Sequence, residues 1–152
     1  MAIEAPISKF SRTNLKIYIV VCIVAAIWLG YDGYFNKKFI EENSPDGKPN
    51  GTLIFNQKAP PVFIAVAVLF GIKLYLIRNK KLIAGEKELI FSDKDKIAYE
   101  SIQKIDKTYF ESKGRFVITY KNENGRETDR KISDREYDNL KAVLEHLVAE
   151  IT

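Results

Sequence analysis

The residues that could catalyse a reaction or bind a metal are few and scattered along the chain. The sequence contains one histidine, His146, and one cysteine, Cys22. A protein metal site needs several ligands at suitable spacing, and neither residue has a second His, Cys or carboxylate placed to share an ion. Cys22 stands in an apolar segment, where a free cysteine usually packs as a small apolar side chain. We therefore expect no metal site, with His146 on the solvent side of a helix.

Motifs for common enzyme chemistry are also absent from the sequence. No phosphate-binding G-x-x-x-x-G-K-[ST] or G-x-G-x-x-G pattern occurs, nor an H-E-x-x-H or G-x-S-x-G pattern. Asp93 and Asp95 stand in a polar turn, and Asp134 and Glu136 at an expected helix start, where acids are common. Asp32 is the one acid beside an apolar segment and is expected at a membrane interface. We predict no catalytic residue, no cofactor and no small-molecule substrate; a membrane enzyme would need an acid–base or nucleophile cluster.

The distribution of charge shows which elements the chain must contain. The 152 residues carry 24 Lys and Arg against 20 Asp and Glu, a net charge of +4. Residues 17–31 and 59–72 have no charged side chain, whereas residues 78–152 hold 16 basic and 15 acidic ones. Such a balance disfavours a nucleic-acid binder, and a single cysteine excludes a disulfide scaffold. The pattern predicts a membrane anchor joined to a soluble domain of about 70 residues.

Two apolar segments are each long enough, with their flanks, to cross a bilayer. We predict transmembrane helices over residues 14–35 and 59–79, joined by a loop at 36–58. Pro60 and Pro61 are expected at the start of the second helix, where proline is tolerated. The alternatives are a cleaved signal peptide for the first segment and a buried helix of a soluble protein for the second.

The basic residues that flank the two segments indicate an orientation. They precede the first segment and end or follow the second, namely Lys9, Arg12, Lys16, Lys73, Arg78, Lys80 and Lys81. By the positive-inside rule, residues 1–13 and 80–152 are cytoplasmic and the loop is exoplasmic. We expect an integral protein of the bacterial inner membrane, with both termini cytoplasmic. Arg78, Lys80 and Lys81 are the candidate contacts for anionic lipid headgroups.

The connecting loop is rich in turn-forming residues. Asp46-Gly47 and Asn50-Gly51 are turn signals, flanked by the apolar groups 39–40 and 53–55. These apolar groups are compatible with a short hairpin, an interfacial segment, or an edge docked on a partner.

Residues 80–152 have the pattern of short strands followed by one helix. Arg115–Tyr120 alternates apolar and polar side chains, and Asn124-Gly125 is typical of a tight hairpin turn. The other expected strands are 88–91, 96–99, a segment within 101–110, and 127–132. Ser133 and Glu136 form a capping-box pattern that predicts a helix start. One apolar stripe follows, made of Tyr137, Leu140, Leu144, Leu147 and Ile151.

This layout resembles the C-terminal domain of small bacterial two-span membrane proteins with a prokaryotic PH-like fold. The resemblance is carried by Leu89-Ile90-Phe91, by Ile97-Ala98-Tyr99 with Ile102 and Ile105, and by 113–120 with the following turn and helix. It implies an α+β protein: a transmembrane helical hairpin followed by a bent antiparallel sheet capped by a C-terminal helix. The domain is short, so one of the usual seven strands is either missing or supplied by Leu82–Ala84. The resemblance also implies a scaffold role.

The sequence therefore leads to two functional hypotheses. The first is a non-enzymatic, membrane-anchored accessory subunit that docks on other membrane-protein subunits through its hairpin and PH-like domain. The second is a peripheral module that senses anionic lipids at the cytoplasmic face of the membrane. The expected partners are other membrane-protein subunits and membrane lipids, with no nucleic acid. A small membrane enzyme is the third class and has no supporting residues.

Overall fold

A computed structural model describes residues 2–152 of the chain, which form two compact units. The first, here called the β unit, combines the N-terminal residues up to Arg12 with Leu76–Thr152. The second, the hairpin unit, is Thr13–Tyr75. The chain is thus α+β, with two long apolar helices, two small antiparallel sheets and a C-terminal helix.

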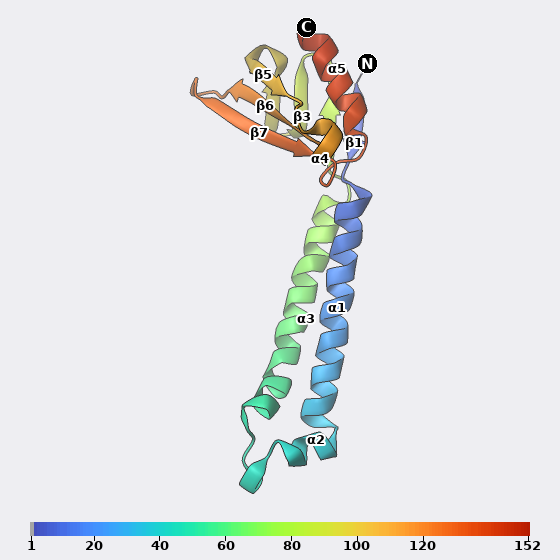
Figure 1. Cartoon of the computed structure of the whole chain (residues 1–152), viewed down its shortest axis with the longest axis vertical. Coiled ribbons are helices and arrows are strands. Elements are labelled where there is room, and N and C mark those ends of the chain that lie inside the picture. The colour runs from blue at the N-terminus through green and yellow to red at the C-terminus, as the bar shows by residue number, and fades with distance from the viewer. Residues whose placement is uncertain (1) are drawn as a thin grey trace. The chain divides into compact units, whose positions relative to one another are not determined.

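The β unit contains two antiparallel sheets. One has the strand order β1-β2-β3-β4 and the other the order β5-β6-β7. The strands are β1 (Ile3–Pro6), β2 (Lys81–Ala84), β3 (Glu88–Ser92), β4 (Asp95–Ala98), β5 (Ile102–Asp106), β6 (Arg115–Lys121) and β7 (Glu127–Ser133). A short 3-10 helix, Tyr99–Ser101, connects the sheets. The helices are α4 (Phe110–Lys113) and α5 (Leu140–Ile151), and α5 contacts β1 and β2 (Figure 1).

The hairpin of β6 and β7 has the predicted alternation. Phe116 and Ile118 of β6 are fully buried, and Phe116 pairs with Ile132 across the ladder. Gly125 closes the turn with φ of 72°, a left-handed conformation that glycine adopts without steric cost. The strand predicted at 127–132 is present as β7, and the strand expected at Leu82–Ala84 is present as β2.

The N-terminal strand β1 is a structural element that the sequence patterns did not reveal. It pairs antiparallel with β2, and its Ala5 side chain is completely buried. Ile7 adds a bridge to Tyr137. The predicted division placed residues 1–13 in a segment of their own, whereas residues 2–12 are part of the β unit. As a result, the hairpin unit is an insertion in the connection between β1 and β2.

Helix α5 has the predicted apolar face but not the predicted start. Leu140, Val143, Leu144 and Leu147 are buried, whereas Ile151 is exposed. The capping-box prediction was wrong, because Ser133 is the last residue of β7 and pairs with Arg115. Its carbonyl then accepts the N–H groups of Glu136 and Tyr137 in a turn, and the helix begins only after Asn139. A long-range sheet contact thus overrides the local helix signal.

A single apolar core holds the β unit together. The two sheets and α5 contribute buried side chains to it, including Leu82, Leu89 and Ile97 from the first sheet and Ile102, Phe116, Ile118 and Ile132 from the second. Burial of such residues is the main stabilising term for a domain of this size. Helix α5 therefore acts as the third layer over the apolar faces of both sheets.

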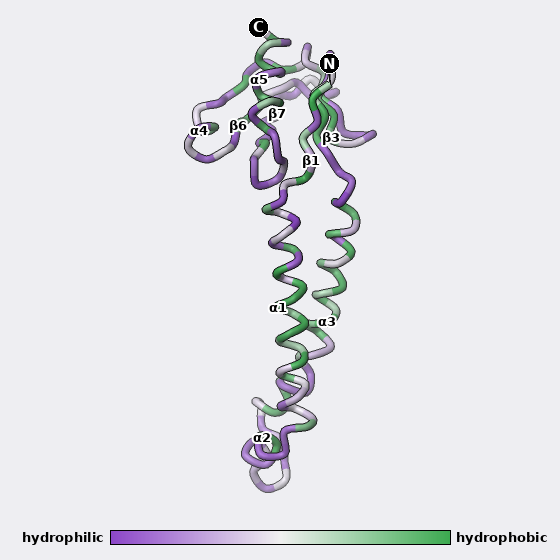
Figure 2. Tube along the Cα trace, turned by 90° about the vertical axis from the view of Figure 1, so that its right-hand side faces the viewer, coloured by the Kyte–Doolittle hydropathy of each residue, from purple (hydrophilic) through white to green (hydrophobic). Residues whose placement is uncertain are grey.

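The hairpin unit consists of two long helices and a short connection. The helices are α1 (Lys9–Tyr34) and α3 (Gly51–Ile77), which overlap the segments predicted at 14–35 and 59–79 but begin earlier. Between them lie α2 (Lys37–Glu42) and a 3-10 turn at Pro45–Gly47. The apolar groups at 39–40 and 53–55 are thus helical and do not form a strand hairpin. Hydrophobic residues run along both long helices in Figure 2.

Pro60 and Pro61 lie inside α3, not at its start as predicted. A proline has no N–H, so the carbonyl four residues earlier loses its helical hydrogen bond. For Pro61 that carbonyl belongs to Gln57, and it accepts a hydrogen bond of 2.8 Å from the Tyr34 hydroxyl of α1. The Gln57 side chain in turn donates to the Gly33 carbonyl at 3.0 Å. Helix α1 therefore supplies a hydrogen bond to the carbonyl that Pro61 leaves without its helical partner. Neighbouring helices commonly satisfy such groups in apolar surroundings.

Small residues allow the two helices to approach closely. Cys22, Ala26 and Gly33 are the small buried residues of α1, and Ala59 and Ala67 are among those of α3. A Cβ atom at Gly33 would lie 2.8 Å from the Asn56 backbone, which is closer than atoms can pack. The sequence has no G-x-x-x-G pattern in these segments, but small residues spaced along a helix have the same effect.

Candidate functional site: a groove beside the last helix

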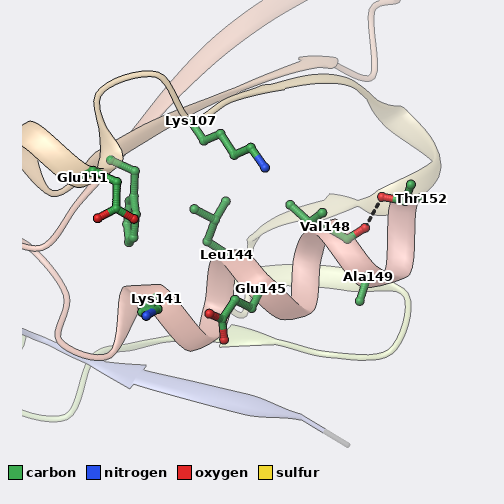
Figure 3. Close-up of a pocket in the computed structure, with 9 residues that line it drawn as sticks. Lys107, Glu111, Lys141, Leu144, Glu145, Val148, Ala149 and Thr152 are labelled. Carbon is green, nitrogen blue, oxygen red and sulfur yellow. Dashed lines mark hydrogen bonds between the residues drawn. The ribbon is translucent and has the colours of Figure 1, made fainter.

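A groove in the β unit runs along α5. Its volume is about 670 Å³, and it is lined by Lys107, Phe110, Glu111, Lys141, Leu144, Glu145, Val148, Ala149 and Thr152. Figure 3 shows Leu144 pointing from α5 into the groove and Lys107 reaching over it from the opposite side. The floor is apolar, and charged side chains stand around it.

Two elements position the walls of the groove. Helix α5 is fixed by its buried face, so Leu144 and Val148 lie where the core meets the surface. On the other wall, the Phe110 ring of α4 packs edge-on against Phe116, with ring centroids 6.1 Å apart. Gly114 ends α4 in a left-handed conformation, with φ of 58°. The groove is therefore a gap between α5 and α4, and each of these elements is packed against the core.

Smaller hollows adjoin the groove at both ends. One of about 220 Å³ is bordered by the strand β5 and by Val148, Ile151 and Thr152 of the end of α5. Another of about 590 Å³ shares Phe110, Glu111 and Lys141 with the groove and extends to Asn139. Since they share lining residues, the three hollows follow α5 along its length. One side of this path is lined by residues of β5, a strand that pairs with β6 and has no second sheet neighbour among the described residues.

The charges around the groove are mixed in sign. Lys107 and Lys141 face Glu111 and Glu145, and all four side chains are exposed. The Lys107 ammonium makes no ion pair or hydrogen bond with any residue the structure describes. An unpaired cation above an apolar floor favours an occupant that combines apolar groups with an acid.

The three candidate lipid contacts of the sequence lie elsewhere in the β unit. Arg78 and Lys80 follow α3 and are exposed, whereas Lys81 is the first residue of β2. The Lys81 ammonium is paired with the Glu4 carboxylate of β1, which the sequence gave no reason to expect. All three residues thus lie at or just before the start of β2, and none of them lines the groove.

Arg130 of β7 connects the two sheets, a contact the sequence patterns missed. Its guanidinium donates two hydrogen bonds, of 2.7 and 2.8 Å, to the Asp95 carboxylate of β4. The same group stacks on the Phe91 ring of β3, 3.6 Å from the centroid. Partial burial alone would lower the pKa of Arg130, but the hydrogen bonds and charge of Asp95 outweigh it, and the pKa is raised. We assign this cluster a structural role.

A second polar cluster joins α5 to the connection between β2 and β3. The Gly85 carbonyl accepts a hydrogen bond from the Tyr99 hydroxyl at 2.8 Å and another from His146 Nε2 at 2.9 Å. His146 is half-buried in this contact and is not on the open solvent side, as the sequence suggested. Burial, and then the charges of Glu150 and Glu88, raise the pKa of Tyr99 to about 12. His146 is thus held by a backbone carbonyl.

No metal site is found among the residues that the structure describes, since no three His, Cys, Asp or Glu side chains form a group that could hold an ion. Comparisons with protein-family models, curated proteins and solved structures give no match for this chain. The groove, the β5 edge and the two apolar helices are therefore the features on which a function can be argued.

Proposed function

We propose that this protein is a non-enzymatic, membrane-anchored accessory subunit of a larger membrane-protein complex. The observation that carries the proposal is the exposure of large apolar side chains along both helices of the hairpin unit. Val20 and Trp28 of α1 are 58% and 68% exposed, and Leu69 of α3 is 64% exposed. A core helix of a soluble protein would bury such residues, whereas a bilayer or an apolar partner would cover them.

The length of the helices supports the same proposal. Helices of 26 and 27 residues, α1 and α3, are long and apolar enough to cross a membrane. At about 1.5 Å per residue, either helix exceeds a hydrocarbon core of about 30 Å. Trp28, Tyr31 and Tyr34 lie towards one end of α1, where aromatic side chains suit an interface. The Trp28 indole donates to Asp32 at 3.0 Å, and Asn36 donates to the same carboxylate at 2.8 Å.

The pairing of β1 with β2 supports the proposed topology. These strands precede and follow the hairpin unit in the chain, so if both helices cross a bilayer, both chain ends lie on one side of it. The basic residues at the start of α1, Lys9 and Arg12, and those after α3, Arg78, Lys80 and Lys81, favour the cytoplasmic side. We therefore propose that the β unit is cytoplasmic, at the inner membrane of a bacterium.

The architecture of the β unit supports the proposed PH-like identity. A four-stranded sheet, a three-stranded sheet and a C-terminal helix follow one another in the order that the resemblance implies. Six strands lie within 80–152, and β1 is the seventh strand among residues 2–152. Such a domain supplies a rigid surface for docking, which fits a scaffold role.

Extraction in mild detergent tests the accessory-subunit proposal. The tagged full-length chain, expressed at its natural level, should elute in a stoichiometric assembly with one or more defined membrane proteins. A matched sample solubilised in a harsh detergent should release it as a monomer. Recovery as a free monomer from the mild extract, with no stoichiometric neighbour, would overturn the proposal.

Lipid sensing is the second candidate, and the exposure of Arg78 and Lys80 favours it. Each basic residue near an anionic surface contributes about 1 kcal/mol to binding. Hydrogen exchange of the full chain should then be slower over residues 78–81 in nanodiscs with anionic lipid than in neutral ones. Raised salt should remove the difference, because it screens the attraction. Equal exchange in both membranes would exclude this role.

A further inference from the structure

We propose that a hollow on the exposed face of α1, near the C-terminal end of that helix, binds a phospholipid with a primary ammonium headgroup, such as phosphatidylethanolamine. The ammonium pairs with the Asp32 carboxylate beside the rings of Trp28 and Tyr31, and an acyl chain lies along Val24 and Ile27. The inference rests on the proposed function, because it requires α1 to cross a bilayer. It adds a lipid site of defined chemistry to the membrane anchor.

The hollow is formed by one face of a single helix. It has a volume of about 510 Å³, and its apolar and aromatic side chains are exposed, whereas its one carboxylate is half-buried. Residues at such spacings of three and four lie above one another on a helix. At about 1.5 Å per residue the hollow is about 12 Å long, which suits a headgroup and part of an acyl chain. The lining residues are Val24, Ile27, Trp28, Tyr31 and Asp32.

Asp32 lies at the depth of a lipid headgroup in the proposed topology. Residues 17–31 carry no charge, and Asp32 is the first charged side chain after them. If α1 crosses a bilayer, this carboxylate stands where the hydrocarbon core meets the headgroups, at the membrane face opposite the β unit. A phospholipid places its charged group at that depth and its acyl chains directly inside it. One lipid molecule can therefore reach the carboxylate and the apolar part of the hollow together.

The Asp32 carboxylate is oriented by neutral groups but keeps its charge. The Trp28 indole donates to Oδ2 at 3.0 Å, and the Asn36 amide donates to Oδ1 at 2.8 Å. No basic side chain within residues 2–152 forms an ion pair with it. Each carboxylate oxygen can accept a further hydrogen bond, and a primary ammonium has N–H groups to donate. A cation bound there also lies close to the indole ring, whose π face attracts cations.

The shape of this face favours a lipid over a partner helix. Helices pack closely in a membrane where small residues let their backbones approach. The small residues of α1, such as Ala26 and Gly33, are buried and are not among those that line the hollow. The exposed face instead presents Trp28 and Tyr31, which would keep another backbone at a distance. A flexible acyl chain can follow such an uneven surface.

The charges select the headgroup. An anionic headgroup without an amine would meet the negative charge of Asp32 and be repelled. A choline headgroup carries a positive charge but has no N–H group to donate to the carboxylate. Lys37 begins α2 one residue after Asn36 and is exposed, so a cation for the phosphate of the same headgroup is close in the chain. A zwitterionic headgroup with a primary ammonium therefore fits best.

Trp28 is the one tryptophan of the sequence, so its fluorescence reports which lipid lies in the hollow. The full-length chain is reconstituted in phosphatidylcholine vesicles that contain an equal fraction of one brominated lipid, whose acyl chains quench a nearby tryptophan. The brominated lipids are phosphatidylethanolamine, phosphatidylcholine and phosphatidylglycerol with the same chains. We expect the relative binding constant of phosphatidylethanolamine to be about fivefold higher than that of either other lipid.

Asp32→Asn tests the role of the carboxylate. The amide keeps an oxygen that can accept a hydrogen bond but has no charge, so the preference should fall to about one. Glu41→Gln in α2 is the matched control, because Glu41 is an exposed acid that does not line the hollow. This variant should keep the preference of the unmodified chain. Helical circular dichroism of each variant verifies that the hairpin is intact.

Two outcomes overturn the inference. One is equal quenching by the three lipids, which would leave this face of α1 to a partner protein. The other is a preference for phosphatidylethanolamine that Asp32→Asn leaves unchanged. Failure of the proposed function looks different, because quenching by none of the brominated lipids would mean that α1 does not lie in the bilayer. Equal quenching by all of them, in contrast, keeps the membrane anchor and removes only the lipid site.

Discussion

The β unit and the hairpin unit place their apolar residues in opposite ways. In the β unit, large side chains such as Phe116 and Ile118 are buried, and charged residues cover the outside. In the hairpin unit, small residues such as Ala26 and Gly33 lie between the helices, and large ones such as Trp28 and Leu69 point outwards. Water drives the first arrangement through the hydrophobic effect. The second is compatible with an apolar surrounding, where close packing and hydrogen bonds hold helices together.

The largest expected effect of a substitution tests that contrast directly. Phe116→Ala removes a ring that is 1% exposed and that supports Phe110 of the groove wall. We expect a loss of about 3–5 kcal/mol in the free energy of unfolding of the β unit. Leu69→Ala removes a side chain of similar character that is 64% exposed, and it should leave the β unit unchanged. Urea unfolding of the full chain in nanodiscs measures both, and equal losses would contradict the contrast.

The next effect concerns the contact between the helices. Gly33→Ala would place a Cβ atom 2.8 Å from the backbone of Asn56, so the helices must separate and the Gln57 hydrogen bond to Gly33 is lost. We expect a destabilisation of the hairpin of about 1–3 kcal/mol. Gly71→Ala is the matched control, because nothing lies within 4 Å of its Cβ position. Thermal unfolding in detergent, followed by helical circular dichroism, should separate the two variants; identical midpoints would show that the close approach is unimportant.

These two regions also differ in how far the sequence predicts them. The alternation at Arg115–Tyr120 and the Asn-Gly turn predict β6 and β7. This prediction succeeds because the two strands are neighbours in the sequence and are joined by a short turn. The positions of the two long helices follow from apolar length alone. Strand β1 could not be predicted, since Ile3–Pro6 is short, contains a proline and pairs with residues about 80 positions away along the chain. The capping-box residues failed for the same reason, as Ser133 is engaged in a distant sheet contact.

The candidate groove was even less accessible to sequence analysis. Lys107, Phe110 and Val148 are ordinary residues in their own segments, and only the packing of α4 and α5 brings them together. The Asp95–Arg130 pair is likewise formed by two strands on different sheets. Charge counting drew attention to Arg78, Lys80 and Lys81 as candidate lipid contacts, but it could not show that Glu4 pairs with one of them.

A smaller effect is expected at the contact between the sheets. Arg130→Lys keeps the positive charge but loses the two parallel hydrogen bonds to Asp95 and the planar stacking on Phe91. Because both side chains are partly exposed, we expect a loss of about 1 kcal/mol in the unfolding free energy of the β unit. Arg126→Lys, in the exposed turn before β7, is the matched control. Urea unfolding measures the difference, and an equal midpoint for the two variants would show that the Arg130 cluster contributes nothing.

The last effect is confined to alkaline pH and to the β unit. Burial, and then the charge of Glu136, raise the pKa of Tyr137 to about 12, and burial likewise raises that of Tyr99 to about 12. An unfolded tyrosine has a pKa of about 10. Below that pH both states keep the proton, and above it the unfolded state loses the proton first. The stability of the β unit should therefore be constant up to about pH 10 and fall as the pH rises towards 12.

Replacing both tyrosines with phenylalanine isolates this contribution. Tyr99→Phe also removes the hydrogen bond to Gly85, so the double variant should be less stable at neutral pH. The decisive quantity is the slope of its unfolding free energy against pH above about 10, which should be shallower than that of the unmodified chain because two of the linked groups are gone. Urea unfolding across this range gives the slope. Parallel slopes for the two proteins would mean that other groups cause the alkaline loss and that the buried hydroxyls of the β unit do not.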